Sequence, residues 1–157
     1  MSIPNGQAQM EQSIRDSLAE LERRQDTISG MMALHFEEYD EAGPSLTLSL
    51  VPAPWMSNPM GVMHGGIVSS ALDSTMGALS FCQVGEGSRT PTVTMSVTFL
   101  RPVPLDKKIY LRAKCSSSGR TLNNLTAELW AEGAPDRLLA TACGTYFRAS
   151  SGQSPLR

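Results

Sequence analysis

The chain has 157 residues, of which 41% are hydrophobic and 18% are charged, and its formal net charge is −2. This length and hydrophobic content predict one domain with a packed core and exclude a disordered protein. The nearly balanced charge excludes a protein that binds nucleic acid through overall positive charge. The three cysteines form no CxxC motif. We therefore expect neither a disulfide scaffold nor a zinc module, and we expect a cytoplasmic, reducing location.

Membrane insertion and secretion are not expected either. No apolar run approaches the roughly 18 residues that a membrane-spanning helix needs. Residues 1–9 lack the basic start and the apolar stretch of a secretion signal. We therefore expect a soluble protein with no membrane partner.

An amphipathic helix is predicted at residues 7–28, because its apolar residues recur at steps of three, four and seven and form one stripe. Gly30 is expected to end this helix. Two strands are predicted next, at residues 31–39 and 45–51, joined by a turn that contains Asp, Gly and Pro. The second strand alternates Leu with Thr and Ser, so we expect one covered face and one uncovered face.

A buried helix is predicted at residues 65–81. Apolar residues lie almost all round its axis, and only small Ser, Thr and Gly residues interrupt them. One ionisable residue, Asp73, lies within this helix. Residues 85–88 are predicted to form the loop that follows it.

The rest of the chain alternates as strands do, at residues 92–99, 105–115, 121–131 and 138–148. The first of these strands is predicted to place Val93, Met95, Val97 and Phe99 on one face and Thr92, Thr94, Ser96 and Thr98 on the other. A turn is predicted at Gly119 and Arg120, and the last three strands are expected to pair as antiparallel neighbours. A sheet of about five to six strands must then cover the buried helix. Its open edge and partly bare face favour self-association.

Asp73 is the first candidate for chemistry. A carboxylate in an apolar helix is unfavourable unless it is hydrogen-bonded or paired. It could be structural, capping a neighbouring loop or holding a subunit contact. It could also be a general base or a nucleophile in a site shielded from water.

The start of the same helix is the second candidate. Gly65 and Gly66 occupy its first positions, where backbone N–H groups lack partners within the helix and the helix dipole is positive. Such an end can polarise a carbonyl oxygen, as an oxyanion hole does. The alternative is that the glycines only relieve crowding against a strand.

The spacing of these two candidates adds a constraint. Gly65 and Asp73 are eight residues apart, about 12 Å along a helix and turned by roughly 80°. One helix therefore cannot bring both groups to one carbonyl, because the reacting atoms must lie within about 3–3.5 Å of each other. Two antiparallel copies of the helix, side by side in a dimer, could do so. We therefore expect that an enzyme built on these residues has a site shared between subunits.

The segment Asn58-Pro-Met-Gly-Val-Met-His-Gly-Gly66, with Leu72-Asp73 and the later Thr98-Phe-Leu-Arg-Pro102, resembles the PaaI-like (phenylacetate-degradation-type) acyl-CoA thioesterases of the hotdog-fold superfamily. The resemblance covers roughly residues 31–149. It implies an α+β hotdog fold, in which an antiparallel sheet wraps round one long central helix, here with an added N-terminal helix. It also implies homodimers that share sites, and usually homotetramers. The chain then divides into the N-terminal helix (1–30), the hotdog domain (31–149) and a flexible tail (150–157).

The resemblance also implies roles for residues. Asp73 matches the catalytic carboxylate, and Gly65 matches the residue whose backbone N–H polarises the thioester carbonyl. Asn58 and His64 match polar residues that support that end of the site, and Thr92 falls where relatives carry Ser or Thr to place the attacking water. The turn that lies near the coenzyme A nucleotide corresponds to Ser118, Gly119, Arg120 and Thr121. No cofactor or metal is implied, because coenzyme A is part of the substrate.

Two departures and one charge pattern accompany this match. The N-terminal helix is not part of the shared motif, and Pro59 follows Asn58 directly. Residues 101–120 hold six basic residues and one acid, which suits the phosphates of coenzyme A, although an ordinary solvated strand face would look the same. His64 could take part directly or could be a buried histidine that orients the loop. His35 is expected at the surface, and Cys82 is expected to be inert packing.

Three functions remain open from the sequence. The first is an acyl-CoA thioesterase, in which Asp73 of one subunit acts with Gly65 of its neighbour. The second is an acyl-CoA or acyl-carrier-protein dehydratase on the same fold, which would need a differently placed His and carboxylate pair. The third is a non-catalytic acyl-CoA binding module. No nucleic-acid partner is expected, because the single N-terminal helix supplies no helix-turn-helix.

Overall fold

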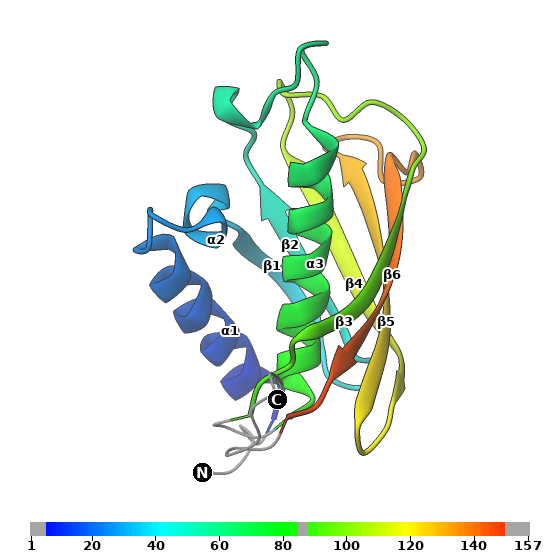
Figure 1. Cartoon of the computed structure of the whole chain (residues 1–157). Helices are drawn as coiled ribbons and strands as arrows, with labels where there is room; N and C mark the ends of the chain where they lie inside the picture. Colours follow the sequence, from blue (N-terminus) through cyan, green and yellow to red (C-terminus); the bar gives the residue numbers. More distant parts are fainter. Residues whose placement is uncertain (1–5, 85–87, 150–157) are drawn as a thin grey trace.

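Six antiparallel strands form one sheet that curves around a long helix in the structure, a computed structural model that describes residues 6–84 and 88–149 (Figure 1). The strands are β1 (His35–Asp40), β2 (Ser45–Leu50), β3 (Thr92–Phe99), β4 (Ile109–Ser118), β5 (Leu122–Ala131) and β6 (Ala140–Phe147). The helices are α1 (Gln7–Glu22), α2 (Ile28–Met32) and α3 (Gly65–Cys82), with a short 3-10 helix η1 at Pro54–Met56. The predicted α+β architecture is confirmed. The predicted tail at 150–157 and most of the predicted loop at 85–88 lie outside the described residues.

The sheet order is β1-β2-β4-β5-β6-β3, so β1 and β3 are its two edges. The last three strands pair as antiparallel neighbours, as predicted, and β3 returns to pair with β6. The face of the sheet that carries the alternating apolar residues of β2, β4 and β5 is fully buried against α3. This packing explains why apolar residues recur at every second position of these three strands.

β2 differs from its prediction, because both of its faces are covered. Thr47 and Ser49, on the face expected to be bare, are 5% and 0% exposed. Arg112 of the neighbouring strand β4 lies over this face and donates from its Nε to the Thr47 hydroxyl at 3.1 Å. A long side chain from a neighbouring strand can therefore bury a residue that strand periodicity alone would leave exposed.

The N-terminal region also differs from its prediction. The first helix ends at Glu22, and residues 28–32 form the separate helix α2, so β1 begins at His35 and not at residue 31. Gly30 lies inside α2 and does not end a helix. A side chain there would overlap the Arg24 carbonyl, so the glycine permits close packing of the chain between α1 and α2.

α1 packs beside β1 through a few specific contacts. Met10 and Ile14 are buried in the core cluster. Gln7 donates from Nε2 to the Tyr39 carbonyl, and the Arg15 guanidinium lies 3.9 Å from the centre of the Phe36 ring.

The start of β4 also differs from the predicted strand at 105–115, because residues 105–108 precede Ile109 as an irregular segment.

Candidate active site

The open side of α3 carries the residues of interest. The helix was predicted to be buried all round, but only one side of it is buried in the described chain, against the sheet. On the other side Ser69, Ser70, Asp73 and Ser74 are half-buried and Phe81 is exposed. One sheet can cover only one side of a helix, so small and polar residues occupy the uncovered side.

Asp73 lies midway along this open side, above the sheet. Its Oδ1 accepts hydrogen bonds from the Thr92 hydroxyl at 2.8 Å and from the Tyr146 hydroxyl at 2.9 Å. Its Oδ2 receives no hydrogen bond from the part of the chain that the structure describes. The carboxylate is therefore held by one oxygen while the other oxygen is free to act.

Thr92 reaches Asp73 because β3 is irregular at its start. The register pairs Thr92 with Tyr146 and then Thr94 with Thr145, so one extra residue, Val93, is inserted between these pairs. A bulge of this kind turns the residue before it to the opposite face of the sheet. The predicted strict alternation of 92–99 is therefore wrong at Thr92, which faces the helix and not the side of Thr94.

Tyr146 was not identified from the sequence. It lies on β6, is 1% exposed, and has its ring beside two glycines. A Cβ at Gly144 would come within 2.9 Å of the ring, and one at Gly77 would come within 3.7 Å. Burial, together with the nearby Asp73 carboxylate, raises the pKa of Tyr146 well above its usual range, so its hydroxyl remains a donor. An aromatic residue flanked at i−2 by Gly, on a strand facing the helix, was the available signal.

Gly65 is the first residue of α3, and its backbone N–H makes no hydrogen bond with the described residues. The next N–H, of Gly66, donates to Nδ1 of His64 at 2.9 Å, so His64 caps the helix. His64 is exposed, so of its two predicted alternatives the buried histidine is wrong. The Phe99 ring packs against Gly65, 3.4 Å from where a Cβ would lie.

Asn58 shapes the loop that leads into α3. Its Oδ1 accepts from the backbone N–H groups of Met60 at 2.9 Å and Val62 at 3.3 Å. Gly61 follows with a φ of 75°, a conformation that favours glycine. The side chain of Asn58 therefore holds the turn, and Pro59 is accommodated within it.

The predicted nucleotide segment, residues 118–121, forms the exposed turn between β4 and β5, at the same end of the molecule as the C-terminus of α3 (Figure 1). Arg148 fastens this turn, donating to the Gly119 carbonyl at 2.6 Å and the Ser118 hydroxyl at 3.2 Å, and also to the Gln83 carbonyl at 2.8 Å. The fully buried Asn123 adds a second tie, because it joins Ser118 to Ser80 of α3. Neither Arg148 nor Asn123 was identified from the sequence.

The six basic residues of 101–120 do not form one patch. Lys108 pairs with Glu37, and Arg112 lies 3.6 Å from Glu38, so both are bonded to β1. Lys107 precedes β4 and Arg120 follows it, and a strand of that length separates them by about 33 Å. Arg120 is therefore the member of this set that lies at the predicted nucleotide turn.

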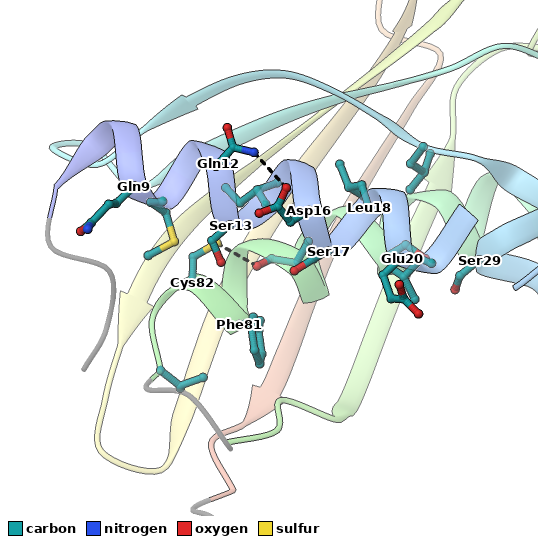
Figure 2. A pocket seen from close by; sticks show the side chains of 17 residues that line it. Gln9, Gln12, Ser13, Asp16, Ser17, Leu18, Glu20, Ser29, Phe81 and Cys82 are labelled. Carbon is teal, nitrogen blue, oxygen red and sulfur yellow. Dashed lines mark hydrogen bonds between the residues drawn. The ribbon is translucent and has the colours of Figure 1, made fainter. Parts of the chain in front are cut away.

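A groove of about 1220 Å³ lies between α1 and the C-terminal half of α3. Figure 2 shows Ser13 and Ser17 of α1 on one side, with Phe81 and Cys82 of α3 on the other. Burial raises the pKa of the Cys82 thiol to about 12, as expected for inert packing.

Among the described residues no group of three His, Cys, Asp or Glu side chains could hold a metal ion, and no helix is long and apolar enough to cross a membrane.

The structure thus brings some predicted residues together and keeps others apart. Asp73 and Thr92 are in contact, and Asn58, His64 and Gly65 gather at the start of α3. Gly65 and Asp73 remain on one uninterrupted helix, about 12 Å apart along its axis. Within one chain, the free N–H of Gly65 and the carboxylate of Asp73 cannot act on the same atom.

Comparison with known proteins gives one family match and many structural ones. A model of the Thioesterase superfamily matches residues 60–136, which include Gly65, Asp73, Thr92 and the 118–121 turn. A phenylacetic acid degradation-related protein from Ralstonia eutropha is 25% identical, and the match covers 83% of this chain and 98% of that one with a TM-score of 0.71. A thioesterase family protein from Silicibacter pomeroyi is 27% identical over 89% of this chain and 98% of that one, with a TM-score of 0.75. A hypothetical thioesterase protein with coenzyme A from Streptococcus pneumoniae is 21% identical over 73% of this chain and 87% of that one, with a TM-score of 0.64.

Proposed function

We propose that this protein, a PaaI-like thioester hydrolase of the thioesterase superfamily with the hotdog fold, hydrolyses an acyl-coenzyme A to a free acid and coenzyme A. The observation that carries the proposal is the Asp73 carboxylate, which is anchored through one oxygen and free at the other on the open side of α3. The presence of coenzyme A in the similar fold from Streptococcus pneumoniae supports this choice of thioester.

Hydrolysis of a thioester needs a carboxylate, a water molecule and a hydrogen-bond donor for the carbonyl oxygen. Asp73 accepts a proton from water, the hydroxide adds to the thioester carbonyl, and the C–S bond breaks as the thiolate of coenzyme A takes up the proton. Alternatively, Asp73 adds to the carbonyl directly, displacing the thiolate, and water then cleaves the resulting anhydride. In both routes the oxygen that becomes negative needs a hydrogen-bond donor, and the free N–H of Gly65 at the positive end of α3 is suited to that role.

The donor comes from a second copy of the chain in this proposal. The separation of Gly65 from Asp73 on one helix requires it, and two features of the surface are compatible with a homodimer. The open side of α3 is lined by small residues, which allows another helix to approach closely. The edge strand β3 has an unpaired edge in the described sheet, and its Val93 and Phe99 are each 55% exposed. Further association of dimers into a tetramer remains part of the proposal.

The phosphates of coenzyme A are assigned to the turn at residues 118–121. Arg148 binds its Gly119 carbonyl and the buried Asn123 accepts from its Ser118 hydroxyl, so the turn can present a fixed surface to the ligand. Arg120 supplies an exposed positive charge there, and a guanidinium is well suited to phosphate oxygens.

The test is thiol release from a panel of short, medium-chain and aryl-acetyl coenzyme A esters, measured with a thiol-trapping dye. We expect the wild type to release free thiol, and Asp73→Asn to lower kcat by at least about 100-fold. Asp106→Asn, which removes an exposed carboxylate in the loop before β4, is the matched control and should keep wild-type turnover. Full turnover by Asp73→Asn would remove Asp73 from the mechanism. A 3-hydroxyacyl coenzyme A that loses water without thiol release, identified by mass spectrometry, would indicate a dehydratase, and tight binding without turnover would indicate a binding module.

A further inference from the structure

We propose that Tyr146 is a positioning residue: together with Thr92 it binds Oδ1 of Asp73, and it thereby makes Oδ2 the oxygen that reacts. This inference rests on the proposed function, because it assigns a part of the carboxylate to the hydrolysis. It concerns a residue on β6 that lies outside the motif segments and outside residues 60–136 matched by the family model.

The two donors are a cross-strand pair. Thr92 and Tyr146 lie opposite each other on the neighbouring strands β3 and β6, and both hydroxyls end on the same carboxylate oxygen above them. The inserted residue Val93 is what turns Thr92 to this face, so the bulge at the start of β3 and the tyrosine serve one geometry. Two donors on one oxygen fix the rotation of the carboxylate, which a single donor would not.

The absence of a side chain at Gly144 makes room for the Tyr146 ring. Gly144 lies two residues before Tyr146 on the same face of β6, and a methyl group there would also lie 3.3 Å from the end of Met76. Gly77 lies one helical turn beyond Asp73 on α3 and faces the other side of the ring. A ring packed in this way, 1% exposed, holds its oxygen in place, 2.9 Å from Oδ1 of Asp73 and 3.3 Å from the backbone carbonyl of the same residue.

The chemical consequence concerns the lone pairs of Asp73. Oδ1 spends its acceptor capacity on two hydroxyl protons, while no described donor competes for Oδ2. A proton from water, or the bond to the acyl carbon, therefore forms at Oδ2 in a fixed direction. Burial keeps Tyr146 protonated, so the anchor persists at alkaline pH.

The experiment compares Tyr146→Phe, Thr92→Val and the double variant with the wild type, using the acyl-coenzyme A ester that the wild type cleaves best. We expect Tyr146→Phe to lower kcat about 10- to 100-fold with KM within about twofold, because a misplaced group loses rate and not substrate binding. The double variant should lose more than the product of the two single losses, since the second anchor is then missing. Thr92→Ser keeps the hydroxyl and should restore most of the rate lost in Thr92→Val.

Tyr39→Phe is the matched control, because Tyr39 is also a buried tyrosine on the sheet, and it should keep wild-type kcat. If Tyr146→Phe reduced folding, Gly144→Ala would displace the ring instead and should give the same split between kcat and KM. Wild-type kcat in Tyr146→Phe, in a protein that cleaves acyl-coenzyme A, would overturn this inference and leave the proposed function standing.

A wild type that releases no thiol from any ester would overturn the proposed function. The orientation of the Asp73 carboxylate would then be determined from crystal structures. Crystal structures of the wild type and of the double variant should show one Asp73 conformer in the former and a rotated or divided one in the latter. The same single conformer in both would overturn the inference whatever the activity.

Discussion

Single hydrogen bonds decide what Asp73 and Gly65 can do. One oxygen of the Asp73 carboxylate accepts hydrogen bonds from two hydroxyl groups. The Gly65 N–H has no hydrogen-bond partner among the described residues, although the next N–H, that of Gly66, donates to His64. The cap takes up one of the free donors at the start of α3 and leaves the adjacent one available. A half-satisfied helix end of this kind suits a site that must hold a transient negative oxygen.

The position of Gly65 allows a substitution that removes the backbone N–H and keeps the helix intact. Proline is well tolerated at the first position of a helix, and His64, at φ −63° and ψ 134°, already has the extended conformation that precedes proline. We expect Gly65→Pro to lower kcat/KM by about 100-fold with little change in the melting temperature, because an oxyanion donor is lost. Gly65→Ala keeps the N–H and should keep most of the activity. Equal activity of the two variants would exclude a role for this N–H.

Arg120 offers a prediction about substrate binding alone. Arg120→Gln should raise KM for the coenzyme A ester about threefold at low salt and leave kcat unchanged, because the proposed assignment places this charge at the nucleotide and not at the thioester. The increase should shrink in high salt, which screens exposed charges. Lys107→Gln, at the other end of β4, is the control and should not change KM. A fall in kcat, or an equal effect at both positions, would contradict the assignment of the turn.

Asp73 and Gly65 could be selected from the sequence because each is anomalous in its own element. Asp73 is an acid in an apolar helix, and Gly65 is a poor helix former at a helix start. Tyr146, Asn123 and Arg148 could not be selected in that way, because Tyr and Asn in a strand and Arg at a strand end are unremarkable until their partners are known. Each of the three acts across a long stretch of sequence, on Asp73, Ser80 and Gln83 respectively.

At the scale of elements, α3 and β6 fit each other through glycines and one aromatic ring. Tyr146 fills the space that Gly144 on its own strand leaves open, and its ring also lies beside Gly77 of the helix. This packing places the phenol oxygen under Asp73. The fit between the two elements is therefore part of the site and not only of the core.

The two glycines should respond differently to alanine. Gly144→Ala brings a methyl to 2.9 Å from the Tyr146 ring, and we expect it to lower the free energy of unfolding by about 1–3 kcal/mol, as overpacking does. At Gly77 the nearest atom is 3.7 Å away, and alanine is the better helix former by about 0.8–1.0 kcal/mol, so Gly77→Ala should be neutral or stabilising. Chemical denaturation of both variants measures this difference. A reversed order would show that the ring is not confined by Gly144.

The elements themselves were largely predictable, and the exceptions have physical causes. The predicted β3 (92–99) matches the observed range, and the predicted α3 is one residue short, because turn residues and alternation mark them clearly. α2 was missed because a five-residue helix is too short to show a period. The bulge at Val93 and the covered outer face of β2 depend on neighbouring strands, which local alternation does not report.

At the scale of the whole molecule, the open side of α3 and the exposed edge strand β3 are the two surfaces left unfinished. A single curved sheet covers one side of its helix, and Asp73 lies beside the covered side, with Oδ1 bound to the core residue Tyr146 and the side chain half-buried. The sequence predicted a site shared between two chains from spacing alone, because residues eight apart on one helix cannot reach the same atom. What it could not indicate is which surface a second chain covers, since contacts between chains leave no period in either one.

Mixing two inactive variants tests the shared site most directly. In a dimer of Asp73→Asn with Gly65→Pro, one site carries both changes, and the other keeps the wild-type Asp73 of one chain and the wild-type Gly65 of its partner. Random exchange of equal amounts makes half of the dimers mixed, so we predict recovery of about one quarter of wild-type thiol release. Each variant on its own, taken through the same exchange procedure, should stay inactive. An equal mixture that exchanges subunits fully and yet remains as inactive as either variant would contradict a site built from two chains.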